Sequence, residues 1–463
     1  MLRHVIAKEL RDCIYGYRSL LVFVLSTLLF GVAIYTGARQ YQVALQEYRL
    51  AQAARRQQLT EPTNLYALGN FGFDLVKPPP VLGILVSGIE PHAPRVYNVA
   101  LFTLPEPRGS SASESPTSAV SGALDLVFIV EGVLGLAALL FTFSAICGEK
   151  ESGTLKLQLA NSLPKDILLS GKLAGNLLGL LVPVALSFLL ACLMLINFGS
   201  VSLNLEDALR ISLLGLDFLL YLTTLFALGI LVSTLTSRST TAFALCLVAW
   251  VFLVAIVPKL AVLAAKLVSP TQSLQEFETK KVEVHRRGSV EAQKEYNRYV
   301  QEHGREMPPL DVYYDVMSRI RDRQNRELKL LEDDYLQQKQ RQERWALRLS
   351  RLSPAGSATY AAMSLARTGL ERDVHFQAAL RDYRSEFTRY YDQKSREQVA
   401  LSRNGRPSTI ITQDLSDLPE FEFHDEPLAP SLDRALPDLG LLVIWSAAFF
   451  SFAYLRFLRY DVR

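Results

Sequence analysis

Residues 147–172, CGEKESGTLKLQLANSLPKDILLSGK, form a short polar segment between two long apolar runs at 124–146 and 173–198. About 20 residues, each rising about 1.5 Å, cross the roughly 30 Å of hydrocarbon in a bilayer. Each apolar run therefore predicts a membrane-spanning helix. The polar segment has an acidic start, apolar residues at helical spacing and a break at Ser162 and Pro164. It predicts a short amphipathic helix along the membrane surface, followed by a turn.

Apolar residues in the rest of the chain are also gathered in blocks, and they make up 49% of its 463 residues. Such blocks are typical of a polytopic membrane protein rather than of one large soluble core. We predict an all-α polytopic membrane protein with a mostly helical extracytoplasmic domain and a smaller mixed extracytoplasmic region. The six predicted transmembrane helices are residues 19–37, 124–146, 173–198, 211–235, 242–267 and 438–458.

The remaining segments are polar or amphipathic. Residues 1–18 carry apolar side chains at helical spacing with charges between them, which predicts an amphipathic interfacial helix. The apolar run after them is longer than the roughly 7–15 residues of a signal-peptide core, so we interpret it as an uncleaved anchor, with a signal peptide as the alternative. Residues 38–123 are the first extracytoplasmic region, residues 269–437 are the large helical extracytoplasmic domain, and residues 459–463 are a cytoplasmic tail.

Helical patterns continue inside the large polar domain. The predicted helices there are residues 271–301, 312–352, 354–370 and 376–401. An interrupted apolar seam that includes Trp345 runs along the second of them, and charges fill its other faces. We favour a solvated antiparallel hairpin over a coiled-coil dimer, which needs longer unbroken heptads. The four cysteines lie in or beside the spans, so no disulfide framework is expected.

The orientation follows from the basic residues beside the spans. These are Arg3, Lys8, Arg11, Arg18, Lys150, Lys156, Lys165, Arg238, Arg456, Arg459 and Arg463. The short loop at 199–207 carries acids and no Lys or Arg. By the positive-inside rule, both termini, residues 147–172 and the loop at Arg238 are cytoplasmic, and the two large polar regions lie outside.

A family resemblance enters at the polar segment. The run Glu-Lys-Glu-Ser-Gly-Thr-Leu at 149–155, followed by Pro164 and by Gly171-Lys172 at the entry to a span, resembles the coupling segment of ABC exporter permeases of the second type. In that family the segment docks into a groove of a cytoplasmic ATPase and passes the closure of the ATPase to the membrane helices. The resemblance implies this ATPase-coupling role for Glu149, Lys150, Glu151, Gly153, Thr154 and Leu155. The alternative is an ordinary interfacial loop.

The spans and the coupling segment together resemble the membrane subunit of such an exporter, from the branch with a large extracytoplasmic domain before the last transmembrane helix. The resemblance implies a multi-pass protein of the bacterial cytoplasmic (inner) membrane, a cytoplasmic ABC ATPase dimer as partner, and a second permease subunit, identical or related. ATP and Mg would be bound by the partner, and no cofactor is expected in this chain. Residues 269–437 are expected to replace the small re-entrant element that usually precedes the last span. Residues 352–370 resemble a Ser-Pro-led segment of some of these permeases and are expected at the membrane surface.

Two functions are consistent with this resemblance. The first is outward movement of a hydrophobic or amphipathic cargo, which the apolar spans favour. The alternative is a non-transporting subunit that transmits ATPase motion to an extracytoplasmic partner in the envelope, through residues 269–437. A net charge of +3 is too small to indicate nucleic acid as a partner.

No catalytic site is expected in the chain. Ser170-Gly171-Lys172 looks like part of a phosphate-binding loop, but Asp166 and Leu173 stand where such a loop has Gly and Ser or Thr. The six histidines are scattered, and no Cys and His residues have the spacing of a zinc site. We therefore predict a transporter subunit that is not an enzyme, with ATP hydrolysis on a separate chain.

Small residues mark the start of the third span. Gly171, Gly175 and Gly179 are spaced four apart, so they share one helix face. A stripe of glycines lets two helix backbones approach closely. We predict that this stripe packs against another helix.

Charged residues inside the spans form the last candidate site. Glu131, Asp217 and Lys259 are predicted to lie at one depth, and we interpret them as a polar patch at an outer gate that contains an Asp217–Lys259 pair. The alternative is that each side chain snorkels to the surface or pairs locally. Pro258, beside the third of them, is expected to kink the fifth span.

Overall fold

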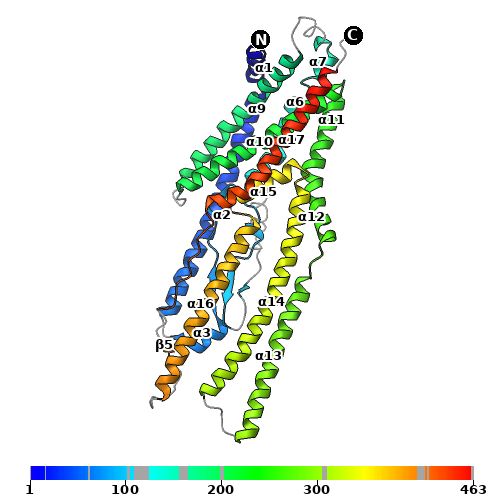
Figure 1. Cartoon of the computed structure of the whole chain (residues 1–463). Helices are drawn as coiled ribbons and strands as arrows, with labels where there is room; N and C mark the ends of the chain where they lie inside the picture. Colours follow the sequence, from blue (N-terminus) through cyan, green and yellow to red (C-terminus); the bar gives the residue numbers. More distant parts are fainter. Residues whose placement is uncertain are drawn as a thin grey trace.

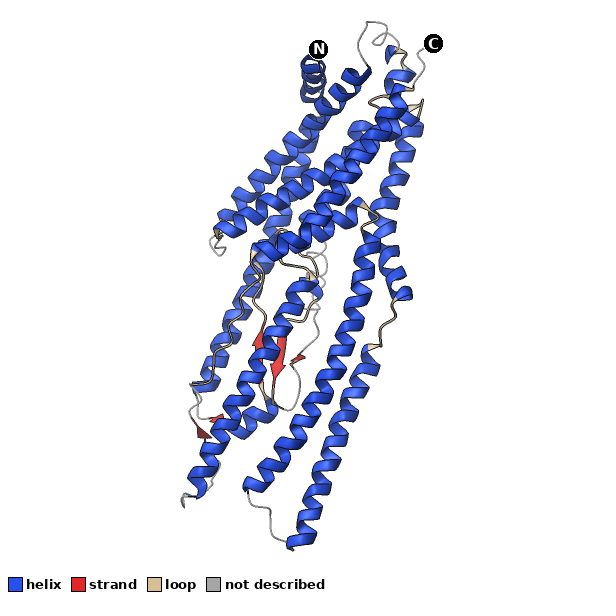
Figure 2. Cartoon of the chain, viewed as in Figure 1, coloured by secondary structure: helices blue, strands red, loops and turns tan. Residues whose placement is uncertain are grey.

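The computed structural model describes residues 2–15, 17–60, 63–101, 105–108, 125–155, 165–198, 203–304, 310–403, 412–413 and 417–459. Long helices dominate it, and the few strands are short (Figure 1; Figure 2). One end of the molecule is a helical bundle, and several helices extend from this bundle in one direction (Figure 1). We call the end of the bundle with α1, α7 and the last turns of α17 the terminal end, and the opposite end the distal end.

The bundle is built from α1 (Leu2–Tyr15), α2 (Tyr17–Thr60), α5 (Leu126–Phe128), η3 (Ile129–Leu134), α6 (Gly135–Thr142), α7 (Cys147–Glu151), α9 (Lys165–Ile196), α10 (Leu205–Leu235), α11 (Ser239–Trp250), η4 (Val251–Ile256), α12 (Val257–Val268) and α17 (Leu428–Leu458). The remaining elements are β1 (Thr63–Asn64), α3 (Leu65–Phe71), β2 (Phe73–Val76), η1 (Val81–Ile84), η2 (Glu90–His92), β3 (Val96–Val99), β4 (Glu106–Pro107), α13 (Leu274–His303), α14 (Leu310–Ser350), α15 (Pro354–Ala366), α16 (Leu370–Arg403) and β5 (Thr412–Gln413).

The described residues contain six helical stretches that are long and apolar enough to cross a membrane. They are Ser19–Gln57, Leu126–Glu151, Ser170–Ile196, Leu205–Leu235, Ser239–Val268 and Leu428–Leu458. The predicted fold class, an all-α polytopic membrane protein, is therefore confirmed. Helix α2 continues without a break far beyond the predicted span, so its second half leaves the bundle as a rigid rod (Figure 1).

Helix α10 lies at the centre of the bundle, with most of its second half buried. Thr224 Oγ1 donates to the carbonyl of Leu442 on α17 at 3.1 Å. Arg210 Nη2 donates to the carbonyl of Glu426, just before α17, at 3.0 Å. Because the two contacts advance in the same order along both helices, α10 and α17 run parallel.

The fifth span is irregular at the place where the sequence predicts a kink. Residues Val251–Ile256 wind as a π-helix, directly before the turn that contains Pro258. Proline has no N–H, and its ring crowds the carbonyl four residues earlier, so a wider turn relieves the contact. The expected kink thus takes the form of a π-helical turn within an otherwise continuous helix.

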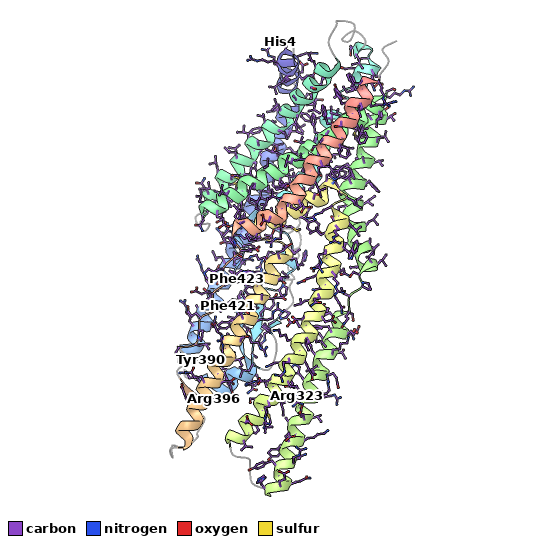
Figure 3. The ribbon with its side chains drawn as sticks, viewed as in Figure 1. His4, Arg323, Tyr390, Arg396, Phe421 and Phe423 are labelled. Atoms are coloured by element: carbon purple, nitrogen blue, oxygen red, sulfur yellow. The ribbon has the colours of Figure 1, made fainter. Side chains whose placement is uncertain are left out.

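Two regions that are far apart in the sequence fold together as one distal unit, which consists of the described residues of 38–108 and of 370–426. Strands β2, β3 and β4 form an antiparallel sheet in which Phe73 pairs with Val99. Phe421 and Phe423 pack their rings 5.8 and 5.0 Å from that of Phe376 on α16, and Figure 3 shows them beside this helix. The buried core consists of Leu68, Phe73, Leu75, Tyr97, Val99, Leu101, Phe376, Leu380, Tyr383, Phe387, Tyr391 and Leu418.

Two arginines of α16 connect the two halves of this unit. Arg372 binds Glu90 at 3.1 Å and Asp425 at 2.7 Å, and its side chain is buried. Arg384 donates to the carbonyls of Ala100 and Leu101 at 3.1 and 2.7 Å. Burial lowers the pKa of Arg384 to about 10, which still leaves its side chain charged at neutral pH.

Helices α13 and α14 form a hairpin that extends from the bundle beside the distal unit (Figure 1). Phe277 and Tyr335 stack at 4.3 Å across it, and Val284 and Leu328 form a small buried contact. Trp345, which the sequence places in the apolar seam, is 39% exposed. That assignment is wrong because Trp345 lies at the surface of α14 under the guanidinium of Arg348, 5.5 Å from the ring centre.

Helix α15 returns to the bundle although it lies inside the predicted extracytoplasmic domain 269–437. It packs against α10, α17 and η4, and nine of its 13 residues are buried, most of them small. The hydroxyl of Ser353, directly before it, donates to the carbonyl of Leu253 in η4. One part of residues 269–437 is therefore packed into the bundle. Replacement of the usual re-entrant element by residues 269–437 stays a prediction.

The distal core predicts a clear difference between two aromatic residues. Phe387 is fully buried, 5.2 Å from the ring of Phe73. Replacing it by Ala should destabilise the protein by about 3–5 kcal/mol, because the surroundings cannot fill the cavity. Trp345→Ala should change stability by less than about 1 kcal/mol. Thermal unfolding of the purified chain in detergent measures both, and equal losses would contradict the assignment of the core.

Candidate functional site

At the terminal end, Lys150 of α7 binds the last turn of α10. Its Nζ donates to the carbonyls of Thr234 at 2.6 Å and Thr236 at 3.1 Å. Carbonyls at the end of a helix have no partner within the helix and carry the negative end of its dipole, so a cation is favourable there. The backbone N–H groups of Ile146 and Cys147 also donate to Ser233 of α10, at 2.9 and 3.0 Å.

Glu151 of the same helix binds the start of α11. Its Oε2 accepts hydrogen bonds from the backbone N–H of Ser239 at 2.9 Å and from the Ser239 hydroxyl at 2.8 Å. A carboxylate at the first turn of a helix satisfies an otherwise unpaired N–H and is stabilised by the helix dipole. Helix α7 therefore joins the end of the fourth span to the start of the fifth.

Glu149 connects α7 to two more helices. Lys172 of α9 donates to Glu149 at 2.5 Å and to Glu9 of α1 at 3.2 Å. Asn176 of α9 also donates to Glu9, at 3.1 Å. The Lys172 side chain is only 4% exposed, so α1, α7 and α9 meet at a largely buried charge cluster.

The structure thus gives Glu149, Lys150 and Glu151 partners within the chain, which the resemblance alone does not indicate. Gly153 and Thr154 are exposed, and Leu155 is fully buried. Gly153 has a φ of 73°, a conformation that side chains with a Cβ rarely adopt. Residues 156–164, the rest of the predicted amphipathic helix and its break, lie outside the described residues. Contact of this segment with an ATPase stays a prediction.

The predicted glycine stripe packs α9 against the interfacial helix α1. A Cβ on Gly175 would lie 2.5 Å from the Cβ of Glu9, and one on Gly179 would lie 2.8 Å from the Cβ of Cys13. Gly171, the first residue of the stripe, is also buried. The close approach brings Lys172 and Asn176 within reach of Glu9, so the glycines and the charge cluster depend on the same helix contact.

At the distal end, Glu131 lies in the π-helical turn η3 and reaches α15. Thr359 Oγ1 donates to Glu131 Oε1 at 2.5 Å. Tyr221 of α10 donates to the backbone carbonyl of Glu131 at 3.1 Å. π-Helical turns release backbone groups from the regular ladder and are frequent at functional sites. Both π-helical turns of the bundle, η3 and η4, are hydrogen-bonded to α15 or to the residue directly before it.

Asp217 and Lys259, predicted to form a pair, differ in burial and lie on different helices. Asp217 is fully buried on α10, and Lys259 is exposed on α12. Neither carboxylate oxygen of Asp217 has a hydrogen-bond partner among the described residues. The predicted Asp217–Lys259 pair is wrong, because α12 turns this lysine away from the bundle interior. Of the predicted patch, Glu131 lies nearer to Asp217, since its carbonyl binds Tyr221, one turn after Asp217 on α10.

Three arginines that the sequence reasoning did not select hold the segment around α15. Arg210 is fully buried and donates to the carbonyl of Leu365, in the last turn of α15, at 3.0 Å. Arg351 binds Asp438 of α17 through two hydrogen bonds of 2.6 and 2.9 Å. Arg367 binds Asp207 of α10 at 2.7 Å. In the sequence, the one sign of these contacts is that Asp207 and Arg210 lie at the border of an apolar run.

A comparison with protein families decides the class of this bundle. The family model described as ABC-2 family transporter protein matches residues 3–462. The chain belongs to the ABC-2 transporter family. This ABC-2 permease is accordingly the membrane subunit of an ABC transporter, and the family implies partnership with an ABC ATPase. A search of curated proteins found no significant match.

The two ends of this ABC-2 permease differ in the side chains that they present. The terminal end offers charged side chains bound to helix ends, and the distal end offers buried acids around α15. In the part of the chain that the structure describes, no three His, Cys, Asp or Glu side chains are grouped as a metal site. The geometry is that of helices fixed to one another by ion pairs and capping contacts.

Matched glycine substitutions test the α1–α9 contact. In Gly175→Ala the added Cβ overlaps Glu9, so α1 has to shift, at a cost of about 1–3 kcal/mol. In Gly440→Ala on α17 the added Cβ meets no atom within 4 Å. We expect a lower melting temperature and faster proteolysis of α1 only in the Gly175 variant. Identical behaviour of the two proteins would argue against close packing at the stripe.

Proposed function

We propose that this ABC-2 permease moves a hydrophobic or amphipathic cargo outward across the bacterial cytoplasmic membrane. A separate ATPase dimer docks on residues 147–172, and a second permease subunit, identical or related, completes the pathway. The observation that carries this proposal is the attachment of α7 to the ends of α10 and α11 and to α9. A displacement of α7 by a closing ATPase moves these helices together, because each contact lies at a helix end or in a buried cluster.

Central helix α10 gives this motion a route to the distal end. Its terminal end is bound by Lys150, and at its distal end Arg210 and Asp207 bind the segment around α15. A helix held by its own hydrogen bonds transmits displacement along its axis. In our proposal, closure of the ATPase shifts α10 and changes how α15 closes the distal end of the bundle.

A second function is favoured by the long rods that leave the bundle. Helix α2 has 44 residues and α14 has 41, and each extends between the bundle and the opposite end of the molecule (Figure 1). Such rods could pass ATPase motion to an envelope partner through residues 269–437 without transport. Measuring cargo-stimulated ATPase activity and transport in the same vesicles separates the two functions, since a transmitter has ATPase activity without transport.

The membrane orientation belongs to the same proposal. Helix α1, α7, the turn before α11 and the end of α17 lie at one end of the bundle (Figure 1). The basic residues beside the spans at this end include Arg3, Lys8, Arg11, Lys150, Arg238 and Arg456. The positive-inside rule favours a cytoplasmic position for such an end. The distal unit and the α13–α14 hairpin then face the outside.

Single cysteines test this orientation in a background that lacks the native cysteines. Ser289 is exposed on α13, and Ser237 is exposed between α10 and α11. In spheroplasts, a membrane-impermeant thiol reagent should label Ser289→Cys and leave Ser237→Cys unlabelled until the membrane is opened. Labelling of Ser237→Cys alone would invert the proposed orientation.

Substitutions of Gly153 test the coupling role. Its φ of 73° suits Gly and is tolerated by Asn, whereas a β-branched residue is strained there by roughly 1–2 kcal/mol. No atom lies within 4 Å of an added Cβ, so strain rather than a clash sets the effect. Gly153→Val should reach the membrane in normal amount and lose stimulation of the ATPase and transport. Gly153→Asn should keep both. Normal export by the Val variant would leave residues 147–172 as an ordinary loop.

A further inference from the structure

The side chain of Asp217 is an unusual feature of the bundle interior. It is fully buried in the middle of α10, and neither carboxylate oxygen has a hydrogen-bond partner among the described residues. An ionisable group buried without a partner is costly, because the low-dielectric interior replaces the hydration it loses. Such residues inside membrane spans are rare and are found mainly on substrate or ion pathways.

The helices packed around Asp217 carry two further acids. Tyr221, one turn after Asp217 on α10, donates to the backbone carbonyl of Glu131 at 3.1 Å. Asp438 lies on α17, which packs along α10. Asp438 is neutralised by the two hydrogen bonds from Arg351, whereas Glu131 receives only the hydroxyl of Thr359. Two acids therefore remain without a basic partner among the described residues.

Nearby basic side chains are already engaged or point elsewhere. Arg210 is bound to Glu206 and to two backbone carbonyls, and Arg367 is bound to Asp207. Lys259 is exposed. Neither arginine can move to Asp217 without breaking a contact that holds the segment around α15.

We propose that Asp217 and Glu131 form the binding site for a positively charged group of the transported molecule, such as an ammonium on an amphipathic cargo. This inference rests on the proposed transport function and names its substrate class. Asp217 supplies an unpaired carboxylate, and Glu131 exchanges the Thr359 hydroxyl for the cationic group. Because Thr359 belongs to α15, the cargo that takes its place on Glu131 also releases one contact that keeps α15 closed on the bundle.

A lipophilic cation provides the test. The complete chain is purified in detergent, and equilibrium dialysis measures binding of radiolabelled tetraphenylphosphonium, with tetraphenylborate as an anion of the same size. The wild-type chain should bind the cation saturably and the anion not at all. Asp217→Asn and Glu131→Gln should each weaken binding at least about tenfold, a change of about 1.4 kcal/mol. Asp12→Asn, which removes an exposed acid of α1, should bind like the wild type.

Each outcome decides the proposal. Asn has the shape of Asp, and the Asp217 carboxylate binds no other described group, so the variant should fold, as its melting temperature will show. Asp217→Glu keeps the charge and should retain binding, which guards against a folding defect in the Asn variant. Absence of saturable binding by the wild type, or unchanged binding by folded Asp217→Asn, overturns the proposal. The measurement needs no ATPase, so failure of the transport proposal would instead show as absent ATPase association or absent transport.

Discussion

A charged side chain, or an unpaired N–H or C=O group at a helix end, needs a partner when it is removed from water. This constraint sets the arrangement of the bundle. Lys150 satisfies the last carbonyls of α10, Glu151 satisfies the first N–H group of α11, and Arg210 satisfies a carbonyl in the last turn of α15. Each contact joins elements that the chain alone does not hold side by side. The bundle is therefore fixed by charged contacts at its ends, while apolar packing and hydroxyl hydrogen bonds such as that from Thr224 to Leu442 hold its middle.

This division has a mechanical consequence. Apolar packing between helices is non-directional, so helices can slide or tilt at small cost, whereas charged contacts at the ends keep the same partners. In the proposed mechanism, motion that starts at α7 is passed on through its ion pairs and caps to α9, α10 and α11. At the distal end, Arg351 joins the residues before α15 to α17, and Arg367 joins the residue after α15 to α10.

Two helical connections hold the distal unit to the bundle. Helix α2 enters it directly from the first span, and α15 leads through a short turn into α16. Arg372 and Arg384 then fix α16 to segments from the first polar region. A displacement of α15 would therefore be passed through α16 directly to the distal sheet. The transport hypothesis and the transmitter hypothesis thus both depend on α15.

The sequence by itself determined the number and type of the membrane helices and most helices of the second polar region, because hydropathy and helical periodicity are local properties. The irregular turn η4 is also a local property, because it accompanies Pro258. The same holds for Gly153, because a glycine suits the left-handed backbone at that position. Only the tertiary structure decided which charges meet. Glu131 reaches α15 through Thr359 and binds Tyr221, one turn after Asp217 on α10, whereas Lys259 turns outward, because helix rotation depends on all neighbours at once. The burial of α15 and the joining of two distant polar regions into one unit were decided in the same way, since contacts between remote segments leave no periodic trace in either one.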